Sequence, residues 1–99
     1  MTRDDGLSLK KRIYVNALYD FYSPLLTQRQ RDVYEMRYFS DLSLAEIAEA
    51  LGITRQAVHI LSNRTAEKLM SLEKDLGFVA RLEHLQNRIR ELESGDECR

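Results

Sequence analysis

The stretch that decides the fold is LSLAEIAEALGITRQAVHILSNRTAEKLMSL, residues 42–72. Ser43 is followed three residues later by Glu46, a capping box in which each side chain accepts a hydrogen bond from the other residue's backbone N–H. Apolar residues then recur at the spacing of one helical face, at Leu44, Ile47, Ala48 and Leu51. Gly52 follows directly, and glycine enters the left-handed region without steric cost. The pattern predicts a short helix that begins at Leu44 and ends at Gly52.

A second helix is predicted directly after this turn. Thr54 is a favoured N-cap residue for a helix that begins at Arg55. The inward stripe of this helix is apolar apart from one threonine, and comprises Val58, Leu61, Thr65, Leu69 and Leu72. Two amphipathic helices joined by a tight glycine-containing turn form a helix-turn-helix, here over residues 43–72. The same caps also permit an ordinary αα-hairpin within a helical bundle.

A helix is also predicted at the start of the chain, over Leu9 to Tyr22. One of its faces is aromatic and aliphatic, with Tyr14, Leu18, Phe21 and Tyr22. We expect Ser23 to leave the helical region because Pro24 follows it. The aromatic residues favour a core role over a base-stacking role, since they bury large areas that a small domain needs.

Another helix follows, announced by the capping box of Thr27 and Gln30, and runs to about Phe39. Three cations give it a positive surface, suited either to phosphate contact or to solvent, at Arg29, Arg31 and Arg37. The sequence therefore predicts three helices before the turn at Thr54 and one long helix after it.

The helical pattern then continues to Leu76, and Gly77 ends or kinks it. The final predicted helix carries apolar residues that alternate by four and three, the a/d spacing of a coiled-coil seam, at Phe78, Leu82, Leu85, Ile89 and Leu92. Two heptads are short for a coiled coil, so we leave open whether this dimer or packing seam is covered by its own domain or by the second chain of a homodimer.

Length and composition bound the remaining possibilities. The chain has 99 residues and a single cysteine, Cys98, which excludes an internal disulfide. We expect one all-α domain over residues 9–93, preceded by an N-terminal arm, 1–8, and followed by a polar tail, 94–99. No apolar run approaches the roughly 20 residues needed to cross a bilayer, and the N-terminus lacks a signal-peptide pattern. We therefore expect a cytoplasmic protein without membrane insertion.

Charge limits any affinity for nucleic acid. The formal net charge is -1, and residues 41–72 carry three cations against four carboxylates. Nucleic-acid-binding domains are typically basic, so we expect random duplex DNA to bind no tighter than about 10⁻⁴ M. The outward face of the second helix is nevertheless polar, and we predict that it contacts nucleic acid or a protein partner through Arg55, Gln56, His59, Ile60, Asn63 and Arg64. Arg29, Arg31, Arg37 and Lys68 are predicted as an accessory basic surface.

Signatures of an enzyme are absent from the sequence. The two histidines, His59 and His84, lack the ligand spacing of a zinc site, and neither a G-x-x-x-x-G-K loop nor a nucleophile elbow occurs. We predict a non-enzyme that uses no metal and no cofactor.

Residues 19–58, YDFYSPLLTQRQRDVYEMRYFSDLSLAEIAEALGITRQAV, resemble the YlxM family of small bacterial helix-turn-helix proteins. That family in turn resembles the promoter-reading C-terminal region of bacterial sigma factors, region four. The resemblance implies a core of four helices plus a C-terminal amphipathic helix. It also implies a gene that commonly neighbours those of the signal recognition particle GTPase and its receptor, and hence a regulatory accessory role in protein targeting, with the GTPase or the RNA of the particle as partner.

The sequence departs from the sigma pattern on the outward face. Arg55 matches a sigma base-contacting position, but Gln56 replaces a glutamate. Where sigma factors carry further arginine and glutamine, this chain has Ala57, His59 and Ile60. An apolar Ile60 suits a protein contact better than a DNA groove. Three functions stay open: a signal recognition particle accessory, a sequence-specific DNA-binding transcriptional regulator, and a dimeric helical scaffold.

Overall fold

The computed structural model describes residues 8–97, with side chains through residue 94. Five α-helices, one 3-10 turn and one π-helical turn follow each other as α1 (Leu9–Tyr22), η1 (Ser23–Leu25), α2 (Gln28–Tyr34), η2 (Glu35–Phe39), α3 (Leu44–Leu51), α4 (Arg55–Leu76) and α5 (Phe78–Glu97). These residues contain no strand, which confirms the predicted all-α fold. Most of the predicted N-terminal arm, residues 1–7, and the end of the predicted tail with Cys98 lie outside the described residues.

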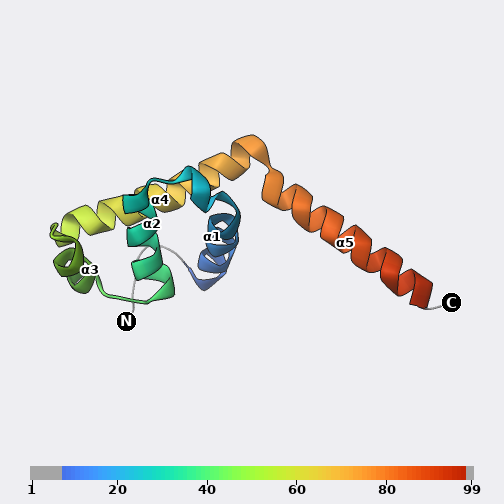
Figure 1. Cartoon of the computed structure of the whole chain (residues 1–99), viewed down its shortest axis with the longest axis horizontal. Helices are drawn as coiled ribbons and strands as arrows, with labels where there is room; N and C mark the ends of the chain where they lie inside the picture. Colours follow the sequence, from blue (N-terminus) through green and yellow to red (C-terminus); the bar gives the residue numbers. More distant parts are fainter. Residues whose placement is uncertain (1–7, 98–99) are drawn as a thin grey trace.

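The long helix α4 organises the molecule. Helices α1, α2 and α3 each pack against α4, whereas α5 extends away from this body beyond Gly77 (Figure 1). The molecule is therefore elongated, with principal extents of 60 × 29 × 19 Å.

The caps of the helix-turn-helix hold as the sequence predicts. The Ser43 hydroxyl accepts a hydrogen bond from the Glu46 backbone N–H at 3.1 Å, and the Glu46 carboxylate accepts one from the Ser43 N–H at 2.8 Å. Gly52 ends α3 in the left-handed region, with φ of 70°. The Thr54 hydroxyl accepts a hydrogen bond from the Ala57 N–H at 3.0 Å and begins α4 at Arg55. Both helices of the predicted helix-turn-helix are confirmed.

Two apolar clusters flank α2 and fix it between its neighbours. The smaller cluster lies within the helix-turn-helix and buries Val33, Ile47, Ala48 and Val58. The larger cluster joins α1, α4 and the start of α5, and the rings of Tyr19 and Tyr34 stack inside it with centroids 4.6 Å apart. Every residue that we predicted for the inward stripe of α4 is buried or half-buried, so this pattern located the core correctly.

Four local predictions need correction. The face of α1 that is buried carries Val15 and Tyr19 together with the predicted Leu18 and Tyr22, while Tyr14 and Phe21 remain 48% and 42% exposed. Ser23 keeps helical angles, φ -54° and ψ -33°, because Pro24 is accommodated inside the 3-10 turn, where its missing N–H costs no hydrogen bond. The last turn before Phe39 is π-helical, and α5 continues to Glu97 rather than ending at residue 93.

Candidate interaction surface on the helix-turn-helix

The first half of α4 presents the residues predicted for partner binding. Val58, Ser62 and Thr65 are buried and mark the inward side of α4, so the residues on its other side face outward. Five of the six predicted residues are exposed and Asn63 is half-buried; the exposed ones are Arg55, Gln56, His59, Ile60 and Arg64. The structure divides these residues between two grooves rather than gathering them into one site.

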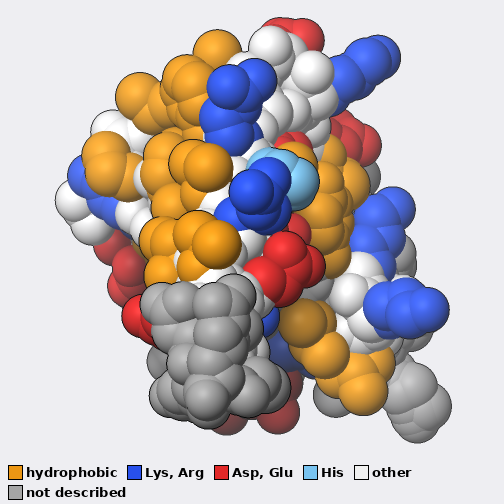
Figure 2. All heavy atoms as spheres, turned by 90° about the vertical axis from the view of Figure 1, so that its right-hand side faces the viewer, with side chains coloured by type: hydrophobic (Ala, Val, Ile, Leu, Met, Phe, Trp, Pro, Cys, Tyr) orange, Lys and Arg blue, Asp and Glu red, His pale blue; other side chains and the backbone are white. Residues whose placement is uncertain are grey.

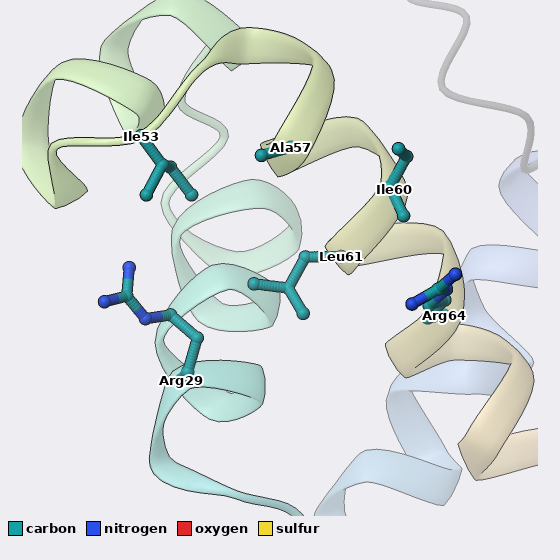
Figure 3. Close-up of a pocket in the computed structure, with 6 residues that line it drawn as sticks. All are labelled: Arg29, Ile53, Ala57, Ile60, Leu61 and Arg64. Carbon is teal, nitrogen blue, oxygen red and sulfur yellow. The ribbon is translucent and has the colours of Figure 1, made fainter.

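The first groove lies between α2 and α4 and has a volume of about 370 Å³. Its lining residues are Arg29, Ile53, Ala57, Ile60, Leu61 and Arg64. Figure 3 shows Leu61 in the middle of this α2–α4 groove, with the guanidinium groups of Arg29 and Arg64 on opposite sides of the apolar residues. Ile60 is 42% exposed at its edge. The groove thus combines an apolar floor with a cationic group at either side.

Three residues of this floor were not among the predicted site residues. Ile53, Ala57 and Leu61 are half-buried. Apolar residues of this kind are interpreted as core residues when only the sequence is considered. Ala57 and Leu61 lie one helical turn apart, and Ile60 and Arg64 lie one turn apart beside them. That spacing is the only sequence signal for the groove, because its other wall comes from α2.

The second groove lies between α3 and α4 and has a volume of about 490 Å³. It is lined by Ser43, Leu44, Ala45, Arg55, Gln56 and His59. The His59 and Asn63 side chains meet at 3.3 Å, Nε2 to Nδ2, so Asn63 belongs with this side of α4. Arg55 and Gln56 therefore occupy the α3–α4 groove at the N-terminal end of α4, apart from Ile60 and Arg64.

Only two of the four residues predicted as an accessory basic surface are exposed in the structure. The Arg31 guanidinium donates to the backbone carbonyls of Ser23 at 3.0 Å and Leu26 at 2.8 Å, and it is half-buried. Arg37, also half-buried, donates to the Leu42 carbonyl at 3.4 Å. Carbonyls near helix ends lack partners within the helix, which explains why these arginines turn inward. Arg29 and Lys68 are exposed and stay available to a partner.

The residues predicted for the seam are all exposed on α5. Their exposed fractions are 48% for Phe78, 43% for Leu82, 52% for Leu85, 54% for Ile89 and 62% for Leu92. Because α5 leaves the body at Gly77, most of this stripe has no neighbour within the described part of its own chain.

The junction between α4 and α5 is a feature that the sequence did not reveal. Glu73 is only 8% exposed, and its carboxylate accepts hydrogen bonds from the Tyr22 hydroxyl at 2.6 Å, the Val79 N–H at 3.1 Å and the Ala80 N–H at 2.9 Å. The Phe78 N–H donates to the Tyr22 hydroxyl oxygen at 3.3 Å. Burial alone would raise the pKa of Glu73, but these hydrogen bonds bring it below its ordinary value. Glu73 therefore caps α5 and ties it to α1.

Among the residues described, no three His, Cys, Asp or Glu side chains come together as metal ligands do. None of the described helices combines the length and the hydropathy of a transmembrane span.

Comparison with known proteins identifies the family. The family UPF0122, described as "Putative helix-turn-helix protein, YlxM / p13 like", matches residues 9–97. A UPF0122 protein of Symbiobacterium thermophilum is 51% identical over 84 residues, which cover 85% of this chain and 76% of that protein. One from Thermoanaerobacter sp. (strain X514) is 40% identical over 85 residues, 86% of this chain and 73% of that protein. One from Bacillus cereus (strain AH187) is 39% identical over 84 residues, 85% and 76% respectively. The chain therefore belongs to the UPF0122 family of YlxM/p13-like helix-turn-helix proteins.

Proposed function

We propose that this protein is a cytoplasmic, non-enzymatic accessory of the signal recognition particle pathway, and that its helix-turn-helix binds the GTPase of the particle. The pathway is supported by the gene neighbourhood that the YlxM resemblance implies. The observation that carries the choice of a protein partner is the α2–α4 groove, whose floor is apolar and whose exposed edge is Ile60.

The composition of this groove matches a protein interface. Cores of such interfaces are apolar and poor in charge, and arginine is among the residue types enriched in interfaces. Burying apolar surface contributes about 25 cal/mol per Å², a gain that a phosphate backbone cannot supply. Arg29 and Arg64 at the sides suit carboxylates that flank apolar side chains, because guanidinium groups bind carboxylates in a forked geometry. We expect the bound segment to be apolar with acidic neighbours.

The test is a titration of the purified GTPase with this protein and with matched variants. Ile60→Asp places a carboxylate at the groove edge and should weaken binding by roughly tenfold or more, because an apolar contact is replaced by a charge that loses its water on binding. Arg55→Ala should weaken it less if the α3–α4 groove forms only the margin of the interface. Ser71→Asp is the control, because it adds the same charge to an exposed position of α4 that lines neither groove.

The outcomes separate the partners. Equal affinity of the wild type and Ile60→Asp for the GTPase would contradict the proposal. If this protein bound the particle's RNA but not its GTPase, the function would instead be RNA recognition. Because Ile60 is already partly exposed, circular dichroism should show unchanged helix content in Ile60→Asp.

One observation favours the second candidate, a sequence-specific DNA-binding regulator. Arg55 and Gln56 are exposed at the N-terminal end of α4, where recognition helices contact bases. This function predicts tight, sequence-selective binding to promoter DNA of the protein's own operon, abolished by Arg55→Ala and tolerant of Ile60→Val. Against it, few phosphate contacts are available, and we expect random duplex DNA to bind no tighter than about 10⁻⁴ M at physiological salt.

A further inference from the structure

The apolar stripe of α5 is long and regular, and this indicates that another protein surface packs against it. We name Phe78, Leu82, Leu85, Ile89 and Leu92 the α5 seam; each member is between 43% and 62% exposed. A helix of this length, 20 residues, extends roughly 30 Å. Figure 2 looks at the molecule from the free end of α5 and shows a column of hydrophobic side chains on the left, smaller hydrophobic groups on the right, and charged side chains between them. Such a stripe is usually an interaction surface.

The charges beside the seam distinguish between the two ways in which two α5 helices can pair. With Leu82 and Ile89 at the a positions of the heptad, Arg81 and Arg88 occupy g, while Gln86 and Glu93 occupy e. In a parallel pair, g of one helix lies beside the next e of the other, so Arg88 meets Glu93 of the second copy. Symmetry repeats this contact. In an antiparallel pair in the register that sets Leu82 opposite Leu85, Arg81 would instead meet Arg88 of the second copy, which is repulsive.

A groove at the base of α5 supports the same orientation. It lies between α1 and α5, has a volume of about 300 Å³, and is lined in part by Asp20, Glu83 and Gln86. Parallel pairing places Arg81 of the second copy beside Gln86, at a groove that carries two carboxylates. Antiparallel pairing would bring Glu93 toward this acidic groove.

The position of the body leaves room for the parallel arrangement. On α5 the body contacts the side that carries Val79, which is 7% exposed, and Gln86, and the α1–α5 groove also includes Leu82 at the base of the seam. The Arg81 and Arg88 side is open, since both residues are exposed and line no groove with the body. A two-fold axis parallel to the two helices then puts the two bodies on opposite sides of the pair.

We propose that a second copy of this chain covers the α5 seam in a parallel, in-register pair. In this pair Arg88 of each copy lies beside Glu93 of the other copy, and Arg81 of each copy lies at the α1–α5 groove of the other copy. The seam spans little more than two heptads, so the pair is a reversible, concentration-dependent dimer rather than a permanent one. The proposal does not depend on the function proposed above.

The seam is tested by sedimentation equilibrium of the full chain and two variants. The wild type should show a monomer–dimer equilibrium, and Leu85→Asp should be monomeric over the same concentrations. Asn87→Asp is the matched control, because residue 87 is exposed on the face of α5 opposite the seam, and it should dimerise like the wild type. A monomeric wild type, or a Leu85→Asp variant that dimerises normally, would overturn the proposal.

The orientation is tested by reversing one charge. In a parallel pair Arg88→Glu faces Glu93 twice, so the dissociation constant should rise by roughly tenfold, because two exposed attractive charge pairs become repulsive. The double variant Arg88→Glu, Glu93→Arg should return it close to the wild-type value. The antiparallel pair that sets Leu82 opposite Leu85 predicts the opposite, because Arg88→Glu would then relieve the repulsion with Arg81. Tighter dimerisation of Arg88→Glu would therefore refute the parallel orientation.

Discussion

Replacing Glu73 tests whether the α4–α5 junction stabilises the fold through hydrogen bonds to one buried carboxylate. Glu73→Gln is nearly isosteric and keeps one acceptor oxygen. Its amide nitrogen, however, is a donor, and it would face a donor: either the Ala80 N–H or the Val79 N–H and Tyr22 hydroxyl together. At least one charge-assisted hydrogen bond is lost, and one N–H at the start of α5 is left without an acceptor.

The magnitude follows from these contacts. Hydrogen bonds to charged groups contribute about 1.5–3 kcal/mol, and an unsatisfied buried donor costs a further 1–3 kcal/mol. Removing the buried charge returns part of this, since Glu73 no longer has to be desolvated. We expect Glu73→Gln to lower the free energy of unfolding by roughly 2 kcal/mol, which for a chain of this size lowers Tm by about 8–16 °C.

The assay is urea unfolding followed by far-ultraviolet circular dichroism. Glu67→Gln is the control, because Glu67 is an exposed glutamate on the same helix and should change stability little. Tyr22→Phe combined with Glu73→Gln completes a double-mutant cycle, and the two changes should be strongly non-additive because the side chains share a hydrogen bond. If Glu73→Gln were as stable as Glu67→Gln, the carboxylate would not be the cap that the geometry indicates.

The contribution of the Glu73 carboxylate to stability should also depend on pH in a defined direction. The pKa of Glu73 is below the ordinary value of 4.5, since the hydrogen bonds outweigh burial, which acts in the opposite direction. The folded state therefore favours the ionised form. The resulting stability is complete above the ordinary pKa and is lost as the pH falls through the lower, folded-state value. The stability difference between wild type and Glu73→Gln should shrink in acid, and a difference that grows instead would contradict this assignment.

Two further predictions concern the turn and the tyrosines. Gly52→Val should destabilise by about 1–2 kcal/mol in a urea titration, from backbone strain alone because no neighbour lies within 4 Å of an added Cβ, whereas Gly52→Asn should cost less. Burial is the largest cause of the raised pKa of Tyr19, Tyr22 and Tyr34, so stability should fall as the pH rises above their ordinary value of 10. An ultraviolet absorbance titration that shows their phenolates forming before helix content is lost would contradict this.

The features predicted most accurately from the sequence are those set by residues within four positions of each other. The box of Ser43 and Glu46, the cap at Thr54 and the left-handed Gly52 each depend on a local hydrogen bond or a local torsion angle. Such interactions form in the same way wherever the helix is placed. The helix-turn-helix and most helix bounds could therefore be predicted to within a residue.

Features that depend on distant residues could not be predicted in this way. Tyr22 and Glu73 lie 51 positions apart, and only the packing of α1 against α4 brings them together. The inward turn of Arg31 depends on where the carbonyls of Ser23 and Leu26 point after an irregular turn. The α2–α4 groove likewise needs two helices to form its walls, so single-helix periodicity placed Ile60 and Arg64 on the outward face of α4 but did not predict the floor between them and Arg29.

The α2–α4 groove lies in the N-terminal half of α4 and the α5 seam begins beyond the C-terminal end of α4, which leads to a last prediction. Ile60 and Glu73 are separated by 13 residues of one helix, roughly 20 Å, and sites so far apart usually contribute independently. The monomeric variant Leu85→Asp should therefore bind the partner in solution with the per-site affinity of the wild type. On a surface densely coated with partner it should dissociate faster, because only the dimer can hold two sites at once. Weaker binding by Leu85→Asp in solution would mean that α5 itself contacts the partner, and the seam and the groove would then form one interface.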